Sequence, residues 1–99
     1  MILVGRDRLD DAIKSGQLPP VATTCWLAEA SNARWLKAKD VMKFYTGVEE
    51  IGPSRLLIPL DDAGHCIVAV VNFEASVMLI AFAGHREGYS MQSGGAGRP

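Results

Sequence analysis

The stretch HCIVAVVNF, residues 65–73, decides the fold of this 99-residue chain. It is rich in β-branched residues, which is typical of a strand. A half-exposed strand alternates apolar with polar side chains, yet here both faces are apolar. One face carries Ile67, Ala69, Val71 and Phe73, and the other carries Cys66, Val68, Val70 and Asn72. Both faces of the sheet therefore need cover, and helices can cover only one face of a single sheet.

Two more strands are predicted around this stretch. RLLIPL, residues 55–60, precedes it across the turn DDAG (61–64), and VMLIAFA, residues 77–83, follows the tight turn EAS (74–76). Pro59 has no N–H to give to a strand ladder, so we expect it on or near an edge strand. Residues 49–54 include Gly52 and Pro53 and are predicted to form a loop.

Before Gly47, the apolar residues follow a helical period. We expect a short strand at 2–5, followed by a helix that Asp7 caps and Gly16 ends. A second helix begins after the proline pair at 19–20. Its predicted apolar face consists of Val21, Cys25 and Ala28, widened by Trp26, Leu27 and Ala30. A third helix is expected over about 38–46.

Helices followed by strands indicate an α+β fold. We therefore predict an N-terminal strand and helices packed on a C-terminal antiparallel meander. The length is that of one domain, which we place at residues 1–90. Residues 91–99 are rich in glycine and are predicted to form a disordered tail.

Composition excludes several classes of protein. Ten Lys and Arg against eleven Asp and Glu exclude a strongly basic nucleic-acid binder, and 48% hydrophobic residues exclude a wholly disordered chain. Charges at 6–8 interrupt the first apolar run, and polar residues interrupt the apolar region 66–83, so we expect a cytoplasmic protein that does not bind membranes. Cys25 and Cys66 could pair, but we expect both to be reduced thiols in the core. Neither cysteine has metal-ligand spacing with His65 or His85, and no metal or cofactor is expected.

Several stretches, taken in order, carry a family resemblance. They are ARW (33–35) through DVMK (40–43), LLI (56–58), the acidic turn, VAVVNF (68–73) and GHREGY (84–89). From about Leu9 to Tyr89 the chain resembles the HigB-like toxins of the RelE/ParE superfamily. These are bacterial toxin–antitoxin proteins, and those of known function are ribosome-associated mRNA endonucleases. The resemblance implies a RelE/ParE-like form of the α+β fold.

The resemblance also implies a set of site residues. RNA cleavage needs a base, a cation for the phosphate and an acid for the leaving oxygen. The His-x-Glu-Tyr-Asp-like box of the family assigns these tasks to His85, Arg86, Glu87 and Tyr89. The plain alternative is a solvated segment after a strand. The residues expected to contact RNA phosphates are Arg34, Lys37, Lys39 and Lys43. The alternative is that they form a solvated helix face. Trp26 and Trp35 are expected in the core and His65 on the surface.

Departures from the family pattern leave two functions open. The arginine expected at the central strand falls at Cys66, a further basic position falls near Val70, and Gly88 stands where the box has its tyrosine. The first hypothesis is an mRNA endonuclease toxin, with an antitoxin, the ribosome and mRNA as partners. The second is a catalytically degenerate relative that binds a protein or itself. Its interface would be the uncovered sheet face with Cys66, Val68 and Val70.

Overall fold

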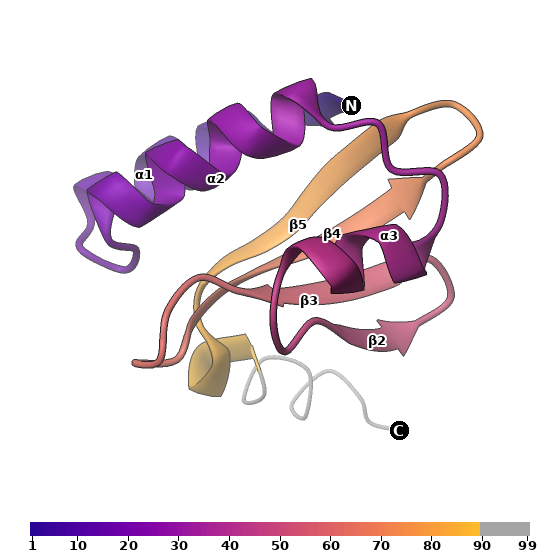
Figure 1. Ribbon diagram of the computed structural model, residues 1–99. Coiled ribbons are helices and arrows are strands. Elements are labelled where there is room, and N and C mark those ends of the chain that lie inside the picture. Colours follow the sequence, from indigo (N-terminus) through magenta and orange to yellow (C-terminus); the bar gives the residue numbers. More distant parts are fainter. Residues whose placement is uncertain (90–99) are drawn as a thin grey trace.

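Within residues 1–89, which the computed structural model describes, five strands form one mixed sheet in the order β1-β5-β4-β3-β2 (Figure 1). The strands are β1 (Ile2–Val4), β2 (Glu49–Gly52), β3 (Arg55–Pro59), β4 (His65–Asn72) and β5 (Val77–His85). Strands β2 to β5 form an antiparallel meander, and β1 pairs with β5 in parallel. The predicted tail at 91–99 lies outside the described residues.

The helices are α1 (Arg6–Lys14), α2 (Pro20–Asn32) and α3 (Ala38–Phe44), and a helical turn over 86–89 follows β5. Gly5, rather than the predicted Asp7, occupies the position before α1. Its φ of 89° is a left-handed conformation that favours glycine. No helix in this part of the chain is long and apolar enough to cross a membrane.

The main core lies between one face of the sheet and the three helices. It joins Leu9 of α1, Trp26 of α2 and Val41 of α3 to the β4 side chains Ile67 and Ala69. Trp35 also belongs to this core, where its ring meets Phe44 and Tyr45 edge-on. The predicted α+β architecture and the core positions of both tryptophans are therefore confirmed.

The second face of the sheet is covered over half of its extent. Leu57, Cys66 and Val68 are buried there, and Ala81, Phe82 and Tyr89 pack against them. The helical turn 86–89 lies beneath the sheet in Figure 1, on the side away from α1 and α2. The expectation that this face stays uncovered is therefore wrong at Cys66 and Val68, because the chain turns back after β5 and covers them itself.

The rest of this face is open. The strand register places Val70 of β4, Val77 and Leu79 of β5, and Ile2 and Val4 of β1 side by side. Ile2 is 64% exposed, Val4 47% and Leu79 45%. Val70 and Val77 are half-buried. We call these five residues the open strip. Of the three predicted interface residues, only Val70 belongs to it.

Two local predictions need correction, and one on Pro59 is confirmed. Residues 49–52 form strand β2 instead of a loop, because their backbone pairs with β3 although their side chains do not alternate. Pro59 lies near the sheet edge as predicted, because β3 is next to the edge strand β2, and β2 pairs with β3 only as far as Leu57, so the ladder is open at the proline. Helix α2 buries Thr23, Trp26 and Ala30. The predicted face is wrong at its centre, since Val21, Cys25 and Ala28 are exposed, but its flanking residues Trp26 and Ala30 are buried as predicted.

Two substitutions on one face of β4 test this uneven cover. Val68→Asp would place a charge in the closed half and should lower the free energy of unfolding by on the order of 3 kcal/mol or more. Val70→Asp, two residues along the same face, should cost clearly less. Urea denaturation measures both. Equal losses would contradict the division of this face into a closed and an open half.

Candidate functional site

Loop 61–64 and the end of β5 form the most polar cluster near the predicted box. His65 and His85 are register partners on β4 and β5, with ring centroids 5.9 Å apart. The backbone N–H of Arg86 donates to the Gly64 carbonyl at 2.8 Å. A pocket of about 340 Å³ opens here, lined by Gly16, Gln17, His65, Phe82, His85 and Gly88. Both histidines of the chain thus meet at one site.

Asp61 orients His65. One carboxylate oxygen, Oδ1, accepts the N–H groups of Ala63 at 3.0 Å and His65 at 3.2 Å. The other, Oδ2, lies 2.7 Å from His65 Nδ1. Desolvation acts to raise the pKa of Asp61, but the hydrogen bonds from His65 and Ala63 outweigh it and lower the pKa below its usual value. Among the described residues, no hydrogen-bond partner occupies Nε2 of His65. A carboxylate-oriented imidazole of this kind can exchange a proton at Nε2.

His85 is engaged at both ring nitrogens. Nδ1 lies 3.1 Å from the Glu87 N–H, which can only donate, so Nδ1 accepts. Nε2 must then carry the proton, which it donates to the Ala63 carbonyl at 2.9 Å. Gly64 lets the loop approach this ring, because a Cβ there would lie 2.5 Å from Nε2. The predicted catalytic imidazole therefore ties the loop to the end of β5.

Arg86 is paired with a carboxylate from the far edge of the sheet. Its Nη2 donates to Glu49 Oε2 of β2 at 2.6 Å. This hydrogen bond raises the pKa of Arg86. The ion pair spans the closed half of the second face, where burial raises the pKa of the Cys66 thiol. A guanidinium held in this way has less capacity to bind a phosphate.

The other predicted catalytic residues do not join the pocket. Glu87 is exposed, and its backbone serves His85. Tyr89 packs against Phe82, with ring centroids 5.3 Å apart. The four residues of the predicted box are thus neighbours in sequence at the end of β5, but they have different partners. Only His85 lines the pocket.

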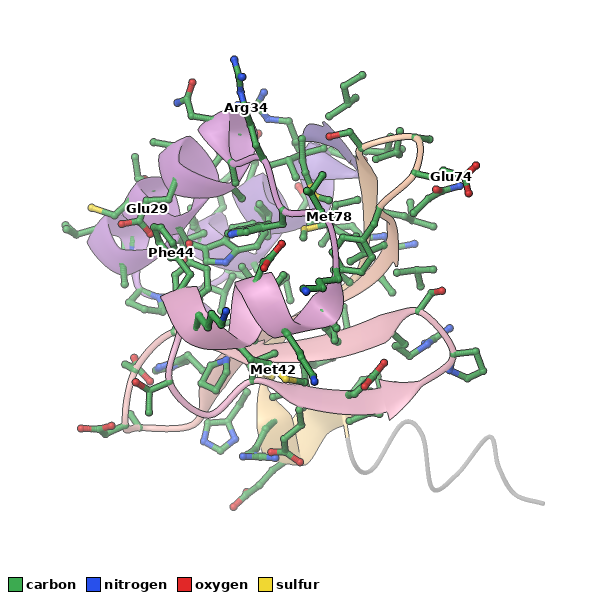
Figure 2. The ribbon with its side chains drawn as sticks, turned by 45° about the vertical axis from the view of Figure 1, so that its right-hand side comes forward. Glu29, Arg34, Met42, Phe44, Glu74 and Met78 are labelled. Atoms are coloured by element: carbon green, nitrogen blue, oxygen red, sulfur yellow. The ribbon has the colours of Figure 1, made fainter. Side chains whose placement is uncertain are left out.

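The predicted RNA-binding residues are all exposed, but they are not a uniform basic patch. Lys37 precedes α3, and Lys39 and Lys43 lie on it. Asp40 sits among them and accepts the Leu36 N–H at 2.9 Å. Arg34 projects beyond the end of α2 in Figure 2, away from α3. None of the four lines the histidine pocket.

Sequence reasoning missed Asp61 as the partner of His65, Glu49 as the partner of Arg86 and Gln17 as a lining residue of the pocket. Asp61 followed by His65 four residues later was a visible signal, because the turn 61–64 brings the aspartate back to the first residue of the next strand. The place of Gln17 in the pocket depends on how the α1–α2 connection packs. The contact of Glu49 with Arg86 depends on strand β2, for which the sequence predicts a loop. No family model matches the chain, and no curated protein matches its sequence.

The lowered pKa of Asp61 predicts a pH-dependent contribution to stability. A carboxyl group whose pKa is lower in the folded than in the unfolded state stabilises above its unfolded pKa, and this stabilisation is lost as the pH falls through the folded value. Wild type should therefore be more stable than Asp61→Asn at pH 7, and the difference should shrink below about pH 4. Urea titrations at several pH values measure it. A difference that is independent of pH would refute the ionic origin.

Proposed function

We propose that this chain is a HigB-like toxin-fold protein that acts by binding another polypeptide through the open strip. The observation that carries the proposal is the exposure of Ile2, Val4 and Leu79 side by side on the uncovered half of the sheet. Contiguous apolar surface of this kind marks interaction sites on small proteins. The observed order of strand, helices and meander supports the family assignment, because the resemblance implies that order.

The engagement of the predicted catalytic groups favours binding over cleavage. His85 uses both ring nitrogens, and Arg86 is neutralised by Glu49. Cleavage through these residues would require both the loop contact and the ion pair to break. The open strip is available without any rearrangement.

Hiding the open strip supplies the free energy of binding. Apolar burial is worth about 25 cal/mol per Å², so several hundred Å² contribute several kcal/mol before the cost of association. The antitoxin implied by the resemblance and a second copy of this chain are both polypeptides that could supply the covering surface. A pocket of about 560 Å³ beside Val70 and Leu79 offers room for an inserted side chain.

An mRNA endonuclease is the second candidate, and the Asp61–His65 pair favours it. In this mechanism His65 Nε2 removes the proton from a ribose 2′-OH while Asp61 stabilises the charged imidazole. The pocket of about 340 Å³ beside His65 would receive the nucleotide. The carboxylates of Asp61 and Asp62, in the loop directly before His65, act against phosphate binding. The ribosome and mRNA are partners of this candidate alone.

Substitution in the open strip tests the binding function. Leu79→Lys should weaken binding of the implied antitoxin, or self-association, by about tenfold or more, since covering the exposed half of a leucine contributes on the order of 1 kcal/mol and a lysine there would place a charge in the interface. Val21→Lys is the matched control, because Val21 is 77% exposed but lies on α2, outside the strip. Sedimentation and co-purification measure both variants. Unchanged association in Leu79→Lys would overturn the proposal.

Inducible expression in bacteria separates the two candidates. The binding function predicts intact mRNA and normal growth when the chain is expressed alone. Growth arrest with mRNA cleavage would instead support the endonuclease. His65→Ala should then lower the cleavage rate about 10²–10⁴-fold, the usual loss for one acid–base group. Loss only in a His85→Ala, Arg86→Ala double variant would assign cleavage to the box that the resemblance implies.

A further inference from the structure

The two edges of the sheet differ in how they are protected. At β2, Glu49 and Glu50 are exposed and the register shifts before Gly52. Charges and bulges of this kind prevent edge strands from pairing with other chains. At the other edge, β1 consists of Ile2, Leu3 and Val4, without a charge, a proline or a bulge. The Met1 amine before it donates to the Ser31 and Ala33 carbonyls at 3.3 and 2.8 Å, so the edge is open only from Ile2 onward, where it borders the open strip.

The backbone of β1 has a defined direction at this edge. The Ile2 N–H donates to the Ser76 carbonyl at 2.8 Å, and Ile2 is in register with Val77 of β5. Along a strand, alternate residues turn their N–H and C=O groups toward opposite neighbours. Ile2 and Val4 therefore direct their backbone groups to β5. Leu3 directs its N–H and C=O outward, to the free edge.

We propose that a second copy of this chain adds its β1 to this edge in antiparallel orientation, with the two-fold axis at Leu3. This inference rests on the proposed binding function of the open strip. Leu3 and the partner's Leu3 then exchange both of their N–H···O=C bonds, as a hydrogen-bonded antiparallel pair does. Ile2 lies directly opposite the partner's Val4, and Val4 opposite the partner's Ile2. The two sheets become one.

Self-complementarity favours a second copy as the occupant. A two-fold contact needs a surface that matches itself. Pairing at Leu3 joins the open strips of the two copies edge to edge, so that each Ile2 and Val4 gains apolar neighbours. An uncharged three-residue strand with two apolar side chains on its open face meets that requirement.

The charges at the two ends of β1 also match across the axis. Residues 6–8, directly after β1, carry two arginines and one aspartate. Glu74 lies in the β4–β5 turn, next to the Ser76 carbonyl that binds Ile2, and projects outward in Figure 2. Antiparallel pairing places the arginine end of one copy toward the glutamate end of the other, where the Met1 amine is already held by the Ser31 and Ala33 carbonyls. Parallel pairing would place like ends together.

Two double variants at the same positions test the register. Ile2→Glu with Val4→Lys places opposite charges across the axis at both pairs, whereas Ile2→Lys with Val4→Lys places like charges there. Because opposite-charge cross-strand pairs stabilise and like pairs destabilise, the first variant should dimerise about tenfold or more tightly than the second. Sedimentation equilibrium measures the dissociation constants, and wild type should be dimeric. Urea denaturation of dilute samples verifies that both variants fold.

Several outcomes would overturn the dimer. One is a wild type that stays monomeric at its highest soluble concentration, and another is equal association of the two double variants. If Leu79→Lys abolishes association while the two double variants behave alike, the binding function stands and the β1 pairing is wrong. If an antitoxin binds the open strip but the chain alone stays monomeric, the second copy is excluded as the occupant.

Discussion

Strand β4 is apolar on both faces, and the need to cover it twice shapes the rest of the structure. On one face, Ile67, Ala69 and Val71 are buried under the helices. On the other, Cys66 and Val68 are buried by side chains from β5 and from the turn after it. Apolar surface left in water is costly at about 25 cal/mol per Å². The cover on the second face ends at Val70, and the open strip begins there.

The turn that closes half of this face depends on the residues that the family resemblance assigns to catalysis. His85 fastens loop 61–64 through Ala63, and Arg86 reaches across to Glu49. The ion pair is exposed and contributes little free energy by itself. Together with Tyr89 against Phe82, however, these contacts define one path for the chain. The box GHREGY therefore has a structural use that is independent of any reaction.

Much of the fold could be predicted from the sequence, because its signals are local. Strands β3, β4 and β5, the turns between them and the core positions of both tryptophans follow from period and composition. The failures concern tertiary packing. The rotation of α2 was missed because Thr23 can be buried when its hydroxyl bonds the Pro19 carbonyl at 2.7 Å. Strand β2 was missed because Glu49 and Glu50 lack an apolar alternation.

The site was less predictable than the fold. A histidine and an arginine in a sequence motif do not reveal which backbone carbonyl or carboxylate will bind their side chains. The engagement of His85 requires loop 61–64 to fold back, and that of Arg86 requires a strand that the sequence does not indicate. The pairing of Asp61 with His65 lies within one turn and was open to prediction. The open strip depends on where β1 docks, which a three-residue strand cannot signal alone.

Solvent exposure of methyl groups, measured by NMR with a soluble paramagnetic agent, tests the central claim most directly. In dilute protein, the methyl signals of Leu57 and Val68 should be shielded from the agent, and those of Ile2, Val4 and Leu79 should be strongly broadened. The latter three should become shielded when the protein is concentrated or a bound polypeptide covers the strip. Equal broadening of Val68 and Leu79 in dilute protein would contradict the account.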